Sequence, residues 1–293
     1  MKDLAIRLAV GVAVVVVVVI AASWVATGDI SDAAPHVIGR PPLDLEASNI
    51  TFASGSGSLI HGWLSHGSPG GGVVLLLHSA RNDRREMLSR AEFLRHRGFS
   101  VLLFDFQAHG ESRGLEVTFG DRESHDVAAA IEYLHHQLPN EKVGVIGVSM
   151  GAASFVLAQG RPRVEAVVLE SMYATLDEAV ANRLRPYLGP LGPPFAALVL
   201  PQLQPRLGIE PGRVRPMDWM ARIDAPVLII NGSADNYTPL AEARGLFAAA
   251  LSPREFWAVE GAGHVDLHAF APAEYERRVG DFLEHYLKVN SQQ

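Results

Sequence analysis

Short runs of consecutive apolar residues alternate along most of the chain with longer stretches in which apolar positions recur at helical spacing. An apolar run without alternation is typical of a strand that is buried on both faces of a sheet. Such runs occupy residues 73–77, 101–104, 143–146, 164–169, 227–230 and 255–259. Helix-like stretches occupy residues 85–97, 121–137, 150–159, 240–251 and 272–288. This order predicts an α/β fold with a doubly wound, mostly parallel sheet and helices on both faces.

The folded domain is predicted to begin near Ser48 with an antiparallel pair of strands. A Gly/Ser-rich turn at residues 54–58 separates two strand-like segments, at residues 50–52 and 59–64. This arrangement is typical of a hairpin. The α/β pattern then continues to residue 288, so we expect one domain over residues 48–288 and a short tail at residues 289–293.

A proline-rich insertion at about residues 172–223 interrupts the alternation of strands and helices. The stretch 186–216 within it holds eight of the 18 prolines in the chain. So many prolines exclude a single continuous helix. The insertion also contains an apolar patch at 195–200 that could pack on the sheet, line a substrate cleft or touch lipid. We expect a lid over the site, with a disordered insertion or a simple packing element as the alternatives.

The N-terminal residues have the pattern of a membrane-targeting segment. Residues 8–26 are 19 consecutive uncharged, mostly apolar positions, preceded by Lys2 and Arg7. As a helix, this stretch would be about 28 Å long, close to the roughly 30 Å hydrocarbon thickness of a bilayer. Cleavage at its end would put the bulky Trp24 at the −3 position, which suits a signal peptidase poorly. We therefore expect an uncleaved signal anchor at residues 1–29, with a cleaved signal or a buried core helix as the alternatives.

The charges around this segment predict which side of the membrane the domain occupies. Lys2 and Arg7 precede it, and Asp29 and Asp32 follow it. The positive-inside rule then leaves the N-terminus in the cytoplasm and places the domain outside. We expect a single-pass, membrane-anchored protein with an extracytoplasmic domain, or a secreted protein if the segment is cleaved. Residues 30–47 contain three prolines and no apolar periodicity, so we expect them to form a linker that tethers the domain.

Composition narrows the range of partners. The chain has 293 residues, of which 48% are hydrophobic and 19% charged, and this is enough for a large folded core. The formal charge of −7 disfavours nucleic acid as a partner. The absence of cysteine excludes disulfides, a cysteine nucleophile and thiolate-ligated zinc. The 12 histidines show no metal-ligand spacing, so we expect no metal and no cofactor, and the pattern leaves the oligomeric state open.

The most specific chemical signal is the sequence Gly-Val-Ser-Met-Gly at residues 147–151. It directly follows the apolar run 143–146 and begins a helical stretch. A serine in this strand-turn-helix setting sits on a sharp turn that exposes its hydroxyl at the carboxyl edge of the sheet. The flanking glycines avoid collisions with the neighbouring strand and helix. Ser149 is therefore the candidate nucleophile, and an ordinary helix N-cap is the alternative.

A serine nucleophile needs a general base and an acid that orients the base. Asp235 follows the apolar run 227–230, and His264 follows the run that ends at Val259, so both are expected in loops at the same sheet edge. We predict His264 as the base and Asp235 as the orienting acid. The alternatives are a turn-capping role for Asp235 and a non-catalytic role for His264. Glu170, at the end of another predicted strand, is the rival acid.

The turn that follows the first long apolar run is the candidate oxyanion loop. Such a turn can direct a backbone N–H into the cleft, where it would bind the oxyanion of a tetrahedral intermediate together with the N–H of Met150. Ala80 is the expected donor, and Ser79 is the second choice. Asp105 and His109 are expected to brace loops beside the site rather than to react.

Together these segments resemble the α/β-hydrolase-fold serine hydrolases, in particular a subgroup with one N-terminal membrane helix whose relatives include protein and lipid acyl-thioesterases. The matching segments are His78 to Ala80, Asp105 to Gly114, Gly147 to Gly151, Leu169 to Thr175, Asn231 to Pro239 and Glu260 to Asp266. The chain order Ser149, Asp235, His264 is also the order of the triad in this fold. The resemblance implies the fold and the triad, while the lid carries no motif that would identify the substrate.

These residues predict a serine hydrolase that cleaves carboxylic esters or thioesters through an acyl-enzyme. The expected partner is a small-molecule or lipid-like acyl substrate. A peptidase or amidase would use the same triad, but it would need a peptide-sized cleft and efficient protonation of the leaving amine. A non-catalytic binding protein of the same fold is a further alternative. A hydrolase with an aspartate nucleophile is disfavoured because Ser149 occupies the turn between strand and helix.

Overall fold

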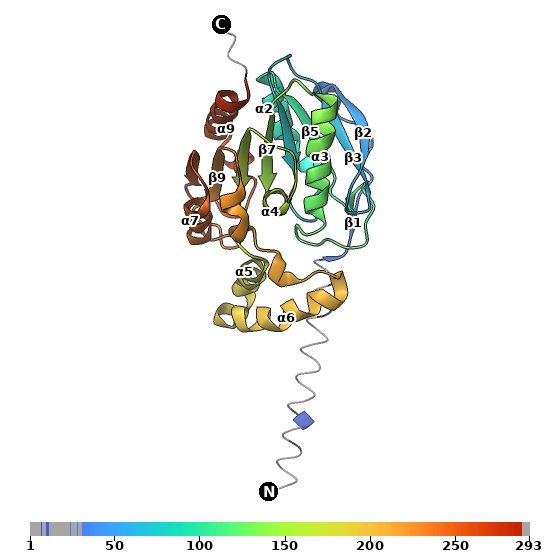
Figure 1. Ribbon diagram of the computed structural model, residues 1–293. Helices are drawn as coiled ribbons and strands as arrows, with labels where there is room; N and C mark the ends of the chain where they lie inside the picture. The colour runs from blue at the N-terminus through green and yellow to red at the C-terminus, as the bar shows by residue number, and fades with distance from the viewer. Residues whose placement is uncertain (1–6, 8–9, 12–23, 25–27, 29–30, 289–293) are drawn as a thin grey trace.

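The computed structural model describes residues 7, 10–11, 24, 28 and 31–288 of the chain. Its central sheet has eight strands in the order β10-β9-β8-β7-β4-β5-β3-β2 (Figure 1). Neighbouring strands from β10 to β5 run parallel, whereas β3 and β2 are antiparallel to their neighbours. The strands span Ala47–Ala53 (β2), Leu59–Ser65 (β3), Val73–Leu77 (β4), Ser100–Phe104 (β5), Val143–Val148 (β7), Ala166–Glu170 (β8), Val227–Gly232 (β9) and Arg254–Val259 (β10). The predicted α/β fold with a mostly parallel sheet is confirmed.

Both faces of the sheet are covered, which explains why the strands are continuous apolar runs. Along β4, for example, Leu75 belongs to one core cluster and the next residue, Leu76, belongs to the other. Helices α3 (Glu123–Gln137), α4 (Met150–Leu157) and α7 (Leu240–Ala249) pack on the first face. Helices α2 (Leu88–His96) and α9 (Pro272–Leu287) pack on the second face. The short helix α8 spans Leu267–Phe270.

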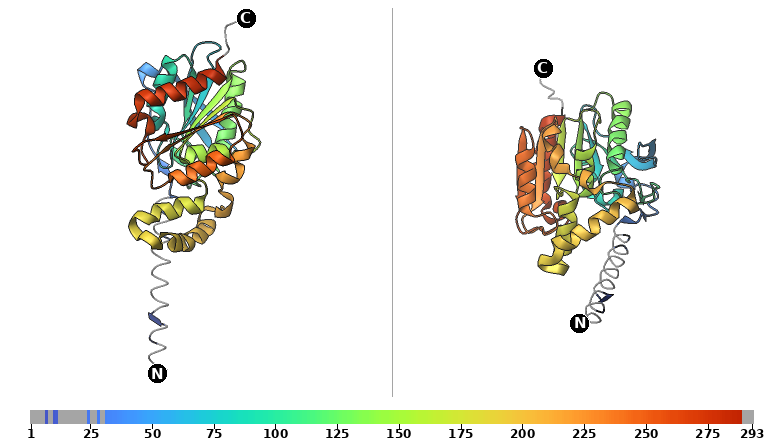
Figure 2. Two further views of the ribbon diagram at one scale, coloured as in Figure 1. Left: turned by 90° about the vertical axis from the view of Figure 1, so that its left-hand side faces the viewer. Right: turned by 60° about the horizontal axis from the view of Figure 1, so that its bottom comes forward.

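The proline-rich insertion folds into two helices, α5 (Leu176–Leu188) and α6 (Gly192–Leu207), followed by two short 3-10 helices at Pro211–Arg213 and Pro216–Arg222. All views in Figures 1 and 2 place α5 and α6 at the end of the domain opposite the C-terminus. A turn at Gly189–Leu191 separates the two helices. The insertion is therefore not a single continuous helix, as its proline content predicts. Pro201 and Pro205 nevertheless lie inside α6, because its buried face contributes contacts that offset the missing backbone hydrogen bonds.

The segment expected to be a free linker packs against the domain instead. Strand β1 (Ala34–Pro35) pairs in parallel with β6 (His109–Gly110). Leu45 is buried in a core cluster, and its carbonyl accepts a 2.5 Å hydrogen bond from the Ser65 hydroxyl. His36 lies 3.2 Å from the carboxylate of Asp83. These contacts are made by individual residues rather than by one periodic face, so the sequence carried no pattern that would reveal them.

The predicted anchor at residues 8–26 lies largely outside the described residues, which include only three of its positions. Within the part of the chain that the structure describes, no helix combines the length and the apolar character needed to cross a bilayer.

Candidate active site

Ser149 lies on the sharp turn between β7 and α4, with backbone angles φ 50° and ψ −110°. A non-glycine residue with positive φ is strained, and such strain is typical of a nucleophile held at the tip of a turn. The turn is tight enough to demand glycine on both sides. A Cβ on Gly147 would lie 2.6 Å from the amide nitrogen of Ala152, and a Cβ on Gly151 would overlap the carbonyl oxygen of Leu77.

The structure brings His264 and Asp235 together at the carboxyl edge of the sheet. Asp235 follows β9, His264 follows β10, and the imidazole Nδ1 lies 2.7 Å from the carboxylate Oδ2. The carboxylate is fixed by Thr238, whose hydroxyl donates to Oδ2 at 2.6 Å and whose amide donates to Oδ1 at 2.9 Å. Burial alone would raise the pKa of Asp235, but these hydrogen bonds and His264 hold it below its ordinary value. Asp235 is therefore an anionic acceptor that can orient the imidazole.

Glu170, the rival acid, lies at the end of β8 and is bound by residues of α2 and α9. Arg90 donates to it through Nε at 3.1 Å and through Nη2 at 2.7 Å. The hydroxyl of Tyr275 also donates to its carboxylate. All three side chains are buried, so Glu170 serves as the counter-ion of Arg90. Arg90 also pairs with Asp266 at 2.8 Å, which ties the loop that carries the histidine to α2.

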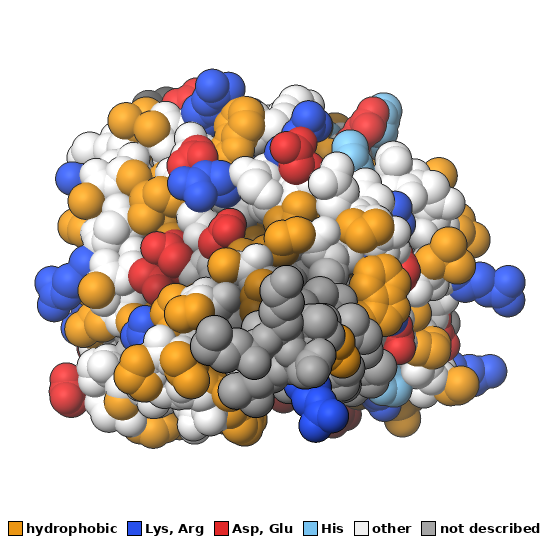
Figure 3. Space-filling view, turned by 90° about the horizontal axis from the view of Figure 1, so that it is seen from below, with side chains coloured by type: hydrophobic (Ala, Val, Ile, Leu, Met, Phe, Trp, Pro, Cys, Tyr) orange, Lys and Arg blue, Asp and Glu red, His pale blue; other side chains and the backbone are white. Residues whose placement is uncertain are grey.

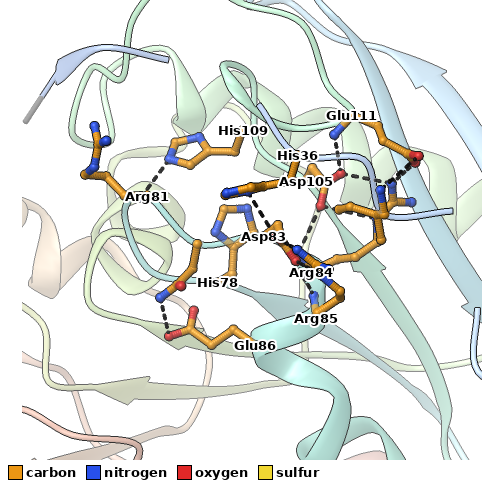
Figure 4. Close-up of polar contacts among 12 residues, drawn as sticks. His36, His78, Arg81, Asp83, Arg84, Arg85, Glu86, Asp105, His109 and Glu111 are labelled. Carbon is orange, nitrogen blue, oxygen red and sulfur yellow. Dashed lines mark hydrogen bonds and ion pairs between the residues drawn. The ribbon is translucent and has the colours of Figure 1, made fainter. Parts of the chain in front are cut away.

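The candidate oxyanion loop leaves a single amide free. The Ser79 amide donates to Glu86 at 2.6 Å. The Arg81 amide donates to Nε2 of His109 at 3.0 Å, as Figure 4 shows. Between them, the amide of Ala80 has no protein acceptor among residues 31–288. The amide of Met150, at the first position of α4, has none in the same range. Ala80, rather than Ser79, is thus the residue whose N–H is available to a ligand.

Two buried, neutral histidines hold this loop in place. His78 accepts a hydrogen bond from the amide of Phe106 at Nε2, at 3.1 Å, and donates from Nδ1 to the Ser79 carbonyl at 2.7 Å. His109 accepts at Nε2 from Arg81 and donates from Nδ1 to the Gln107 carbonyl at 2.8 Å. Burial lowers the pKa of His78 to about 3 and also lowers the pKa of His109. Both rings therefore act as fixed braces and not as proton carriers.

A buried charge cluster supports the same loop from behind. Arg84 pairs with Asp105 at 2.9 Å and also with Glu111, and its guanidinium lies over the ring of Trp63. Figure 4 shows Arg84, Asp105 and Glu111 close to one another. Sequence reasoning missed Arg84 and Glu86. The only signal for them was the dense run of charges at residues 83–86, directly after the predicted turn.

The predicted site residues line one cavity of about 480 Å³. Ser149, Met150, Ala80 and His264 contribute to its wall, while Asp235 lies behind the histidine. One wall is apolar and is formed by Phe119 together with side chains of the proline-rich insertion, namely Tyr173, Leu176, Ala179, Val180, Leu184, Val199 and Leu203. Among the described residues no group of three or more His, Asp or Glu side chains could hold a metal ion. The cavity thus presents the strained Ser149 and the carboxylate-bound imidazole of His264 to a ligand space with an apolar wall on one side.

Comparison with known proteins places this arrangement in a family. Residues 59–278 match the Alpha/beta hydrolase family, and the chain belongs to it. Among curated relatives, the uncharacterized protein Rv2307c of Mycobacterium tuberculosis is 31% identical over 223 residues, which are 74% of this chain and 72% of that protein. The uncharacterized protein YqkD of Bacillus subtilis is 25% identical over 220 residues, which are 73% of this chain and 71% of that protein.

Solved structures show the same fold. The Pyrococcus furiosus esterase Pf2001 is similar with a TM-score of 0.71 and 27% identity, covering 88% of this chain and 98% of that one. The esterase domain of a Rhodothermus marinus protein is similar with a TM-score of 0.60 and 22% identity, covering 82% and 99%. The second likeness concerns the fold alone.

Proposed function

We propose that the protein is a serine hydrolase that cleaves carboxylic esters or thioesters through an acyl-enzyme intermediate, with Ser149, His264 and Asp235 as its triad. One observation carries the proposal. The only imidazole described in the cavity wall is bound to a buried carboxylate at 2.7 Å, and it shares that cavity with a serine held in a strained conformation. The similarity to the Pyrococcus furiosus esterase supports the same class of chemistry.

The mechanism follows from the roles of these groups. His264 Nε2 takes the hydroxyl proton as Ser149 Oγ attacks the acyl carbon, and Asp235 stabilises the imidazolium that forms. The amides of Ala80 and Met150 donate to the oxyanion of the tetrahedral intermediate. The imidazolium then protonates the leaving alcohol or thiol. A water molecule, activated by the same imidazole, hydrolyses the acyl-enzyme and restores the serine.

The cavity favours an acyl group of moderate size over a peptide. Its lid side is apolar, and its volume of about 480 Å³ is in the range of sites for small ligands. A panel of nitrophenyl esters and thioesters of graded chain length, compared with aminoacyl anilides, tests this preference. Rapid ester cleavage with little anilide cleavage supports the proposal, and the reverse ranking would establish a peptidase or amidase. Failure of a fluorophosphonate probe to label Ser149 would favour a non-catalytic binding protein.

Replacing Glu86 by glutamine is expected to lower kcat by about 10-fold to 100-fold with little change in KM. The Glu86 carboxylate accepts from the amide and the hydroxyl of Ser79 and from the side chain of Asn82. A glutamine amide cannot accept at both ends, so the loop would shift and misplace the Ala80 amide. Losing an oxyanion donor altogether costs about 10²-fold to 10³-fold in kcat. Steady-state kinetics on a small soluble ester measures the effect.

The matched control is Glu92→Gln, which changes an exposed carboxylate on α2, the helix that directly follows the short 3-10 helix of Glu86. It should leave kcat unchanged. If Glu86→Gln lowered the thermal midpoint and kept the wild-type kcat, Glu86 would have a purely structural role.

We infer further that residues 8–26 anchor the enzyme in a membrane, with the domain outside the cytoplasm. The support is the length of the apolar stretch and the charges on its two sides. A secreted form produced by cleavage is the alternative. An N-terminus that begins after residue 26 in the mature protein would establish that alternative.

Deleting residues 1–29 should give a soluble enzyme that keeps its kcat/KM for a small soluble ester within a few fold. Its rate on acyl substrates embedded in vesicles should fall, because anchoring supplies a high local concentration. Deleting residues 1–47 should instead lower the thermal midpoint, since that cut also removes buried Leu45 and the pairing of β1 with β6. Equal rates of full-length protein and the shorter deletion on both kinds of substrate would contradict the anchor.

A further inference from the structure

The lid has a charge opposite to that of the rest of the chain. The lid, residues 172–223, contains six arginines and four carboxylates, two of which (Asp177 and Glu178) begin α5, in a chain whose formal charge is −7. The lid therefore carries +2 and the remainder carries −9. Arg183 and Arg185 are exposed on α5, and neither forms an ion pair among the described residues. Such a basic segment on an acidic protein is suited to an anionic surface.

The outer surface of the same helices is apolar. Tyr187, Leu191 and Leu198 are 79%, 61% and 48% exposed, whereas Val199 and Leu203 on the inner side are buried and line the cavity. Figure 3, which views this end of the domain, shows hydrophobic side chains gathered across it. Exposed leucines and an aromatic residue beside arginines form the pattern of a surface that rests in the interface of a bilayer.

The N-terminal segment joins the domain at this surface. The Arg206 guanidinium, on α6, donates to the carbonyl of Trp24 at 3.0 Å, lies over its ring and pairs with Asp32 at 3.3 Å. Ser31 is already buried in the domain. Only the few residues after Ala26 separate the apolar stretch from Ser31, and five residues can span at most about 18 Å. An anchor at 8–26 therefore keeps Ser31 within about 18 Å of the anchor's end, and Arg206 of α6 contacts the neighbouring Asp32.

We propose that the outer surface of α5 and α6, formed by Tyr187, Leu191, Leu198 and the adjacent arginines, docks on an anionic lipid bilayer. This inference rests on the proposed anchoring and adds which surface of the domain contacts lipid. A second copy of the chain is a poorer occupant, because the proposed anchor joins the domain at this surface through Arg206 and directs it towards lipid. Arg183 is exposed and also lines the cavity. The rim of the cavity therefore lies on the docked surface, so acyl substrates can enter from the bilayer.

The absence of cysteine makes a direct test possible. Full-length protein carrying Leu198→Cys or Leu191→Cys is labelled with an environment-sensitive fluorophore and reconstituted into vesicles with about 30% phosphatidylglycerol. Nitroxide-bearing lipids should quench these labels. The control is Leu251→Cys, which is 52% exposed and lies just before β10, at the amino edge of the sheet. That label should be quenched several-fold less.

Charge reversal separates lipid docking from simple proximity. Arg185→Glu should reduce quenching at position 198 by at least about two-fold, and raising the salt concentration should have the same effect. Arg163→Glu, a change of another exposed arginine at the opposite edge of the sheet, should have no effect. Equal quenching at positions 198 and 251 would overturn the proposal. A fluorescence change at position 198 that depends on protein concentration in the absence of lipid would also overturn the proposal. Fluorophosphonate labelling of the same samples measures the reactivity of Ser149 independently. Failure of the docking proposal can therefore be distinguished from failure of the proposed hydrolase activity.

Discussion

Replacing Ser149 by alanine is expected to reduce kcat by several orders of magnitude, up to roughly 10⁶-fold, while the protein remains folded. The side chain supplies the attacking oxygen, and no other hydroxyl on this turn can replace it. The fold should survive because the hydroxyl makes no hydrogen bond with the described residues. Burst-phase kinetics with a nitrophenyl ester measures the loss of the acyl-enzyme, and circular dichroism confirms the fold.

Ser154→Ala is the matched control for this variant. Ser154 is a buried serine on α4 whose hydroxyl donates to the carbonyl of Met150 at 2.7 Å. It lies outside the cavity wall, so its loss should affect stability slightly and turnover hardly at all. Near-wild-type turnover by the Ser149 variant would end the proposed mechanism.

The parts of the protein that the sequence could predict are those that local rules determine. Each buried strand is a continuous apolar run, and the sharp turn around Ser149 needs glycine at two defined positions. Asp235 and His264 could be assigned to one edge because parallel strands bring their carboxyl ends together. These are relations between a residue and the strand that precedes it, and they can be read along the chain.

The remaining features depend on contacts between distant segments. Whether Ala80 or Ser79 offers the free amide is decided by Glu86 and His109, which occupy the amides on either side. The packing of residues 31–46 rests on single contacts such as that of His36 with Asp83. Continuation of α6 through two prolines likewise depends on its burial against the domain. No periodic pattern encodes such interactions.

Only the hydrogen-bond partners of Glu170 in the fold exclude it as the orienting acid. Its position at the end of β8 suited an orienting acid as well as the position of Asp235 did. In the fold, however, its side chain is committed to Arg90 and Tyr275, so it has no free oxygen for His264.

Asp235→Asn is expected to lower kcat by about 10⁴-fold with little loss of stability. The amides of Tyr237 and Thr238 donate to Oδ1 of Asp235, so an asparagine would keep its oxygen there and place its nitrogen at the position of Oδ2, which contacts the imidazole. An amide nitrogen at that position would donate to Nδ1 of His264, which forces the proton onto Nε2. The ring could then no longer accept the proton of Ser149. Steady-state kcat on a soluble ester, with a denaturation curve for each variant, measures both quantities.

Glu170→Gln should give the opposite result. It leaves Arg90 with the partly exposed Asp266 as its remaining charged partner, and since breaking a buried pair outright costs about 3–5 kcal/mol of unfolding free energy, we expect a loss of up to that size. The carboxylate that orients His264 is untouched, so kcat should stay within about 10-fold of the wild type at a temperature where the variant is folded. A large loss of kcat at unchanged stability for Glu170→Gln, together with a mild effect for Asp235→Asn, would transfer the role of orienting acid to Glu170.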